Sequence, residues 1–140
     1  MPDHATSTFT VTSWTEEPWD ERPGGPKVTR AVVAKAFTGD LEGSSALQYL
    51  MAYRDDGSAD FVGLERVDGR LAGRSGTFVL RHVGAFIDGA ATGSWSIVDG
   101  SGTDELEGIR GESQFSLPKG EDAFPFALDY SLPESLLAER

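Results

Sequence analysis

The sequence predicts an all-β protein folded as a single eight-stranded antiparallel up-and-down β-barrel. Apolar and polar residues alternate with a period of two along successive short segments, and Gly-containing turns such as Asp68-Gly69 and Asp88-Gly89 separate these segments. No long stretch has the i, i+3, i+4 apolar spacing of an amphipathic helix. Closing eight sequential strands into a barrel removes the edges that an open meander would expose. A two-sheet sandwich is the alternative.

The strands are expected in sequence order with short turns between them. In the first, residues 6–14, threonines at even positions alternate with Phe9 and Val11. Residues 16–26 concentrate Pro, Gly and charge, which predicts an exposed loop. Further strands are expected at residues 28–37, 41–54, 59–67, 70–85, 91–99, 112–117 and 124–132, with a Gly-rich connection over 99–111. The barrel would occupy residues 6–132 of one domain, 1–140, and the tail from Pro133 would form a short helix or fray.

Length and charge limit the function classes. A chain of 140 residues fits one domain with one core. Its 12 Lys and Arg against 23 Asp and Glu give a net charge of −11, which argues against nucleic-acid partners and electrostatic membrane attachment. The absence of Cys excludes a disulfide framework, a thiolate zinc site and a cysteine nucleophile. No apolar run reaches the ~20 residues of a membrane span, and the N-terminus resembles no export signal, so we expect a cytoplasmic protein.

The familiar cofactor and metal motifs fail on inspection. The glycines around residues 99–104 resemble a dinucleotide-binding loop, but Glu105 stands where the last glycine should be. The same segment resembles a calcium loop, but Arg110 occupies the position of its bidentate acid. The chain has only two histidines, so a multi-histidine metal site cannot form. We therefore expect no cofactor and no metal.

The two hairpin turns assemble one face of the barrel wall. A two-residue turn at Asp88-Gly89 places His82 opposite Trp95 and Leu80 opposite Ile97. A second turn at Asp68-Gly69 pairs Glu65 with Ala72 and puts it on the same side as Phe78. We predict that this face lines the barrel interior and supplies the candidate ligand-binding residues: Phe61, Glu65, Phe78, Leu80, His82, Trp95 and Ile97.

Glu65 and His82 are the candidate catalytic residues, because polar groups inside a barrel need partners or a function. On the functional interpretation, an apolar pocket raises the pKa of Glu65 and tunes His82 for proton transfer. On the structural interpretation, Glu65 is an acid at the barrel mouth and His82 is satisfied by a backbone carbonyl or water. The catalytic residues, and whether the protein is an enzyme at all, stay open at this point.

Several segments resemble one known family. They are FVGLERV (61–67), GRSGTFVL (73–80), HVG (82–84), GSGT (100–103), LEGIRG (106–111) and LDY (128–130). The chain resembles, from about residue 8 to residue 132, a bacterial domain family of unknown function with an allene oxide cyclase-like, calycin-type β-barrel. The resemblance implies an eight-stranded barrel akin to allene oxide cyclases and dirigent proteins, whose lumen holds an apolar small molecule. It transfers no catalytic residue.

Three functions follow as hypotheses. The first is binding of a small apolar ligand in the lumen, and the second is an isomerase or cyclase that uses Glu65 or His82 for proton transfer. The third is a packed barrel whose outer wall contacts other proteins.

The expected ligand is neutral or weakly basic and mostly apolar, because the net charge is −11 and the inner face offers a carboxylate but no cluster of Lys and Arg, with Arg74 as the one exception. Glu65, His82 and the indole N–H of Trp95 would orient its polar group. We also expect a homodimer, because the outer face carries apolar residues, namely Val62, Leu64, Val79 and Val98.

Overall fold

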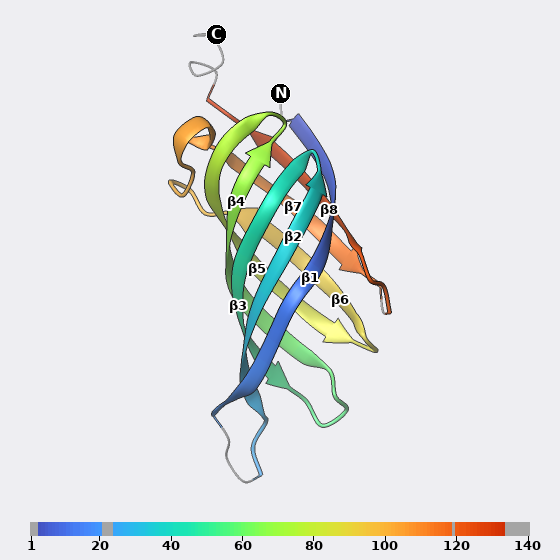
Figure 1. The fold of residues 1–140 in the computed structure, drawn as a ribbon. Helices are drawn as coiled ribbons and strands as arrows, with labels where there is room; N and C mark the ends of the chain where they lie inside the picture. The colour runs from blue at the N-terminus through green and yellow to red at the C-terminus, as the bar shows by residue number, and fades with distance from the viewer. Residues whose placement is uncertain (1–2, 21–23, 119, 134–140) are drawn as a thin grey trace.

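Eight antiparallel strands close into one barrel in the computed structural model, which describes residues 3–20, 24–118 and 120–133 (Figure 1). The strands are β1 (Asp3–Asp20), β2 (Val28–Gly39), β3 (Leu41–Tyr53), β4 (Ala59–Leu71), β5 (Arg74–Ile87), β6 (Ala90–Ile97), β7 (Arg110–Leu117) and β8 (Phe124–Ser131). Each strand pairs with its sequence neighbours, and β1 pairs with β8 from Asp3 opposite Tyr130 to Phe9 opposite Phe124. The predicted closed barrel is confirmed, and the sandwich alternative is wrong.

The register predicted for β5 and β6 is confirmed. Asp88 and Gly89 form the turn with φ of 53° and 83°, the left-handed conformation that a tight two-residue hairpin requires. His82 lies opposite Trp95, and Leu80 lies opposite Ile97. The sequence therefore placed these four side chains on the correct face.

The turn predicted at Asp68-Gly69 is wrong. Both residues lie inside β4, and the chain reverses at Ala72-Gly73, where φ is 49° and 86°. A Cβ on Gly69 would lie 2.1 Å from the backbone oxygen of Glu42, so this glycine permits close approach of β3 rather than a turn. Glu65 pairs with Leu80, not with Ala72. Because the turn moved by an even number of residues, the residues predicted to face inward still do so.

The loop predicted over residues 16–26 is also wrong in its first part. β1 continues to Asp20, and Glu16, Glu17 and Pro18 pair with residues of β2. Pro18 is tolerated because β1 has no partner other than β2 at this level. Residues 21–23 of the predicted loop, and most of the predicted tail, lie outside the described residues.

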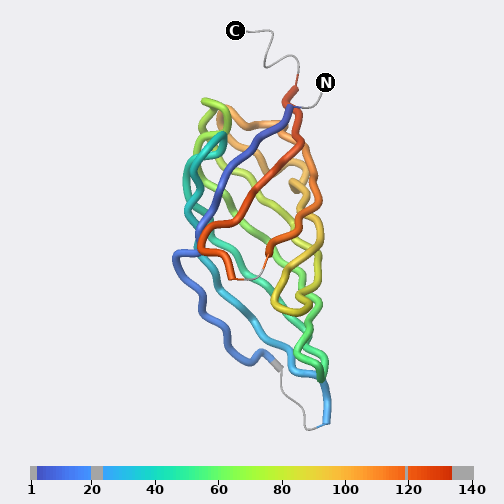
Figure 2. The backbone as a smooth tube through the Cα atoms, turned by 90° about the vertical axis from the view of Figure 1, so that its right-hand side faces the viewer, coloured from blue at the N-terminus to red at the C-terminus, as the bar shows by residue number. Residues whose placement is uncertain are grey.

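The two ends of the barrel differ. At the terminal end, where the described chain begins at Asp3 and ends at Pro133 (Figure 1), the connection between β6 and β7 contains a short 3-10 helix (Asp104–Leu106). Its Leu106 and the nearby Ile109 are fully buried, so this connection closes the terminal end of the barrel. At the opposite end, the long strands β1 to β4 extend beyond the turn between β7 and β8, which leaves an uneven rim (Figure 2).

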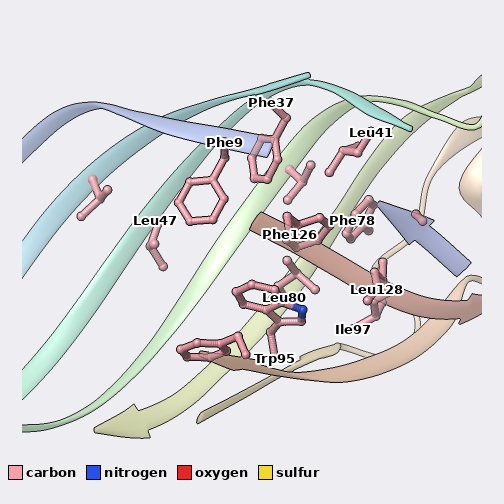
Figure 3. Packing of buried hydrophobic residues seen from close by; sticks show 14 of the residues in the cluster. Phe9, Phe37, Leu41, Leu47, Phe78, Leu80, Trp95, Ile97, Phe126 and Leu128 are labelled. Atoms are coloured by element: carbon pink, nitrogen blue, oxygen red, sulfur yellow. The ribbon is translucent and has the colours of Figure 1, made fainter. Parts of the chain in front are cut away.

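Inward-facing side chains from all eight strands form the core. Phe9, Phe37, Phe78, Trp95 and Phe126 are at most 3% exposed and point into the barrel from different strands (Figure 3). The rings pack against each other, with the Trp95 and Phe126 centroids 4.8 Å apart. The predicted aromatic interior is thus confirmed, and the terminal half of the barrel is a packed core.

Candidate functional site

A cavity of about 200 Å³ lies at the barrel end opposite the termini. Most of its lining is apolar, and Lys35 is the charged residue among those that form it. The lining residues are Phe9, Val11, Trp14, Val33, Lys35, Tyr49, Met51, Phe61, Phe86, Gly89, Ala91, Leu117, Pro118, Gly120 and Phe124. The cavity reaches the surface, because Val11 and Trp14 are 39% and 47% exposed.

A bulge in β1 shapes this cavity. The pairing with β2 shifts between Val11 and Ser13, so Thr12 is an extra residue in the strand. Strict alternation would send Val11 and Trp14 to opposite faces of the wall. The bulge instead allows both side chains to line the cavity.

Beneath the cavity wall lies a buried polar cluster of four residues from four strands. Glu65 accepts a 2.7 Å hydrogen bond from Nε2 of His82 at Oε1 and a 2.5 Å hydrogen bond from the Ser45 hydroxyl at Oε2. Nζ of Lys35 lies 3.5 Å from Oε1 of Glu65 and 4.2 Å from the centroid of the Phe9 ring. Glu65 and His82 are at most 1% exposed, and Lys35 is 5% exposed.

The cluster perturbs the pKa of each of its ionisable groups. Burial acts to raise the pKa of Glu65, but the charge of Lys35 and the hydrogen bonds from His82 and Ser45 outweigh it and hold that pKa at about 2. Burial lowers the pKa of Lys35, against the opposing effect of Glu65. Burial likewise lowers the pKa of His82 more than Glu65 raises it. At neutral pH the cluster therefore contains an ionised Glu65 and a neutral His82.

This pKa corrects one expectation about Glu65. The functional interpretation required an apolar pocket to raise the pKa, whereas the three partners of the carboxylate lower it. A carboxylate with a pKa of about 2 holds no proton to donate at neutral pH and is a weak base. His82 Nε2 donates to Glu65, so its neutral ring leaves Nδ1 as an acceptor, and this buried atom has no partner among the described residues.

The predicted ligand-binding residues divide into two groups. Phe61 lines the cavity. The others lie deeper in the barrel and do not line it: Glu65, Phe78, Leu80, His82, Trp95 and Ile97. The indole N–H of Trp95, which we expected to orient a ligand, donates a 3.0 Å hydrogen bond to the carbonyl of Ala127. Trp95 also stacks on Phe115 with centroids 4.6 Å apart, so its role is packing.

Lys35 is the functional candidate that the sequence argument missed. The residue expected to supply a cation was Arg74, but Arg74 begins β5 at the terminal end, away from the cavity. The inward positions of β2 include Ala31, Val33, Lys35 and Phe37. The sequence signal for Lys35 was therefore one charged residue at every-second positions that are otherwise apolar. The signal was weak because the outward positions of β2 also include Val32, Ala34 and Ala36.

A second hollow lies on the outer wall, across β2 to β5. Val32, Leu50, Val62 and Leu64 contribute apolar side chains that are 38% to 57% exposed. Val79 also lines this outer groove, whereas Val98 lies elsewhere and is partly buried. The groove contains Arg66 and Arg81 and no acidic residue, which is unusual on a chain of net charge −11.

Within residues 3–20, 24–118 and 120–133, no group of three or more His, Cys, Asp or Glu side chains is placed to hold a metal ion. The same residues contain no helix with the length and apolarity to cross a membrane.

Comparison with known proteins gives one family and one fold. Residues 5–130 match the family described as a protein of unknown function, DUF3224. A solved structure from Shewanella oneidensis MR-1, described as a DUF3224 protein of unknown function, shares 30% identity and superimposes with a TM-score of 0.80. The match covers 95% of this chain and 99% of that one. A comparison with curated protein sequences gives no match.

Proposed function

The chain belongs to the DUF3224 family, and we propose that it binds a small, mostly apolar ligand in the cavity opposite the termini. The observation that carries this proposal is an apolar cavity of about 200 Å³ that reaches the surface and has Lys35 as the charged residue among its described lining residues. Ligand sites combine apolar walls with a few polar groups in this way. At about 30 Å³ for each water-sized group, the cavity holds roughly seven non-hydrogen atoms, and a slightly longer ligand would extend into its open edge at Val11 and Trp14.

The charges of the cluster favour a neutral ligand. Lys35 and Glu65 lie 3.5 Å apart and compensate each other. A carboxylate ligand would bring a second buried anion near Glu65, and desolvating an ion costs several kcal/mol. A hydroxyl or carbonyl oxygen accepts a hydrogen bond from Lys35 without that cost. The expectation of a neutral ligand therefore stays, but its reason is the ion pair rather than the absence of a cation.

Thermal unfolding with octan-1-ol and octanoate tests this proposal, because the two probes differ only in the head group. At ten times its dissociation constant, a ligand stabilises the protein by about 1.4 kcal/mol, which corresponds to a rise in Tm of about 3 to 6 °C. We expect this rise with octanol and a smaller one with octanoate. Ala91→Phe, which fills the cavity, should abolish the rise, and Ala52→Phe on the outer face should retain it. No rise with either probe would refute the proposal.

We also propose that the outer groove joins two copies of the chain. Apolar side chains on a barrel wall have a lower free energy when a partner buries them than when they are exposed to water. The described lining of the groove contains no acidic residue, so a contact there does not bring carboxylates of the two copies together. A two-fold contact would place the same face of both copies together.

Light scattering at micromolar concentration tests the homodimer. The wild-type protein should have twice the mass of the chain, and Leu64→Glu should halve it. Ile87→Glu is the control, because Ile87 is 52% exposed but lies outside the groove. A wild-type protein with the mass of one chain, or a Leu64→Glu variant that stays dimeric, would show that this groove does not join two copies.

A further inference from the structure

Lys35 lines the cavity, and its amine lies in chemically unusual surroundings. The side chain is 5% exposed, and it lies among apolar cavity residues with the Phe9 ring 4.2 Å from Nζ. A lysine ammonium has three N–H donors. Among the described residues, Glu65 at 3.5 Å is its polar partner, so the amine keeps donor positions that no protein acceptor fills.

The surroundings of the amine match those of reactive lysines. Desolvation in an apolar pocket makes lysine a nucleophile at neutral pH, because it favours the uncharged amine. Burial is the largest influence on the pKa of Lys35 and lowers it from the ordinary value. We propose that Nζ of Lys35 forms an imine with a small apolar aldehyde or ketone held in the cavity opposite the termini. This inference rests on the proposed function and specifies the ligand class.

The covalent step balances without any further reactant. The lone pair of Nζ attacks the carbonyl carbon, a C–N bond forms, and the carbonyl oxygen takes up a proton. The resulting carbinolamine loses that oxygen as water, and a C=N bond forms. Overall, one ammonium and one carbonyl compound give one iminium ion and one water, so the positive charge is conserved. Water leaves through the exposed edge of the cavity at Val11 and Trp14.

Glu65 has a specific part in this chemistry as a counter-ion. His82 and Ser45 hold its carboxylate at hydrogen-bond distances of 2.7 and 2.5 Å, independently of Lys35. The carboxylate therefore stays beside the nitrogen when the ammonium becomes an iminium. Because the charge at Nζ is the same before and after the reaction, the buried ion pair is retained. A neutral carbonyl ligand thus satisfies both the apolar walls and the charges of the cluster.

Reductive trapping tests the inference on the folded wild-type chain. The protein is incubated with octanal and sodium cyanoborohydride at pH 7, and the labelled lysines are located by peptide mass spectrometry. The chain has three lysines, and Lys27 is an exposed internal reference. Because burial raises the share of neutral amine at Lys35, we expect labelling of Lys35 at least about tenfold faster than of Lys27.

Two controls separate this inference from the proposed function. Octan-1-ol has no carbonyl and should raise Tm without giving an adduct, and it should slow the labelling of Lys35 but not of Lys27. Lys35→Arg keeps the charge beside Glu65 and should lose the fast adduct. If octanol raises Tm while octanal labels Lys35 no faster than Lys27, the imine is refuted and ligand binding stands. If neither compound raises Tm and Lys35 is not labelled, both proposals fail.

Discussion

Glu65→Gln should destabilise the barrel strongly, because the substitution removes one charge and almost no volume. Glu65 is 1% exposed and lies 3.5 Å from Nζ of Lys35. With an effective dielectric constant of about 20, the attraction at this distance is about 5 kcal/mol. The lowering of the Glu65 pKa from 4.5 to about 2 corresponds to about 3 kcal/mol. Breaking a buried ion pair by removing one partner costs about 3–5 kcal/mol, in agreement with both figures.

Urea unfolding at pH 7, followed by tryptophan fluorescence at one fixed protein concentration, measures this loss. With a denaturant slope of about 2 kcal/mol per molar, the midpoint should fall by roughly 2 M. Glu107→Gln is the control, since Glu107 is exposed, and its effect should stay within about 0.5 kcal/mol. A loss below about 1 kcal/mol for Glu65→Gln would refute the ion-pair argument.

The same variant gives a prediction for acid. Because the folded state lowers the pKa of Glu65, its contribution is complete above the unfolded value near 4.5 and disappears as the pH falls through about 2. The difference in the free energy of unfolding between the wild type and Glu65→Gln should therefore become smaller as the pH falls from 4.5 to 2. The double variant Lys35→Met/Glu65→Gln removes both charges, so no buried ion is left unpaired. Its free energy of unfolding should be higher than that of Glu65→Gln by about 1 kcal/mol or more.

Two further predictions test other parts of the structure. Gly69→Ala should destabilise the barrel by about 1–3 kcal/mol in urea unfolding, because its Cβ would lie 2.1 Å from the backbone oxygen of Glu42; an unchanged midpoint would contradict the close approach of β3 and β4. Burial lowers the pKa of His82, so the unfolded chain binds a proton more readily and stability should fall as the pH drops below about 6.5. His82→Phe should make the free energy of unfolding less dependent on pH between 7 and 5, and an unchanged slope would show that His82 is not the group responsible.

The fold was predictable because its determinants are local. Alternation with a period of two and turns with glycine identify strands and hairpins within a few residues of sequence. The errors arose where local signals have two meanings. Asp68-Gly69 has the composition of a turn, but its glycine serves a contact with Glu42 on another strand. Residues 16–20 have the composition of a loop, but pairing with β2 extends the strand.

The candidate site was less predictable because it depends on contacts between distant strands. The hairpin registers brought Glu65 and His82 to one face, and the structure joins them at 2.7 Å. Lys35 on β2 reaches Glu65 on β4 across the intervening strand β3. The two residues are 30 positions apart in the chain, so no local pattern in the sequence connects them. The cavity itself depends on a bulge at Thr12, for which strict alternation gives no signal.

The cluster links the stability of the barrel to the chemistry of its cavity. A buried carboxylate that served only the core could be replaced by apolar residues at little cost, since buried ion pairs seldom stabilise a fold more than good apolar packing does. In this barrel Ser45 and His82 fix Glu65 from the side of the core, and Lys35 carries the compensating charge to the cavity wall. The desolvation that makes this pair expensive for folding also favours the nucleophilic form of the Lys35 amine. A variant that removes both charges should therefore unfold with a free energy closer to that of the wild type than Glu65→Gln does, and yet lose the selective labelling by octanal.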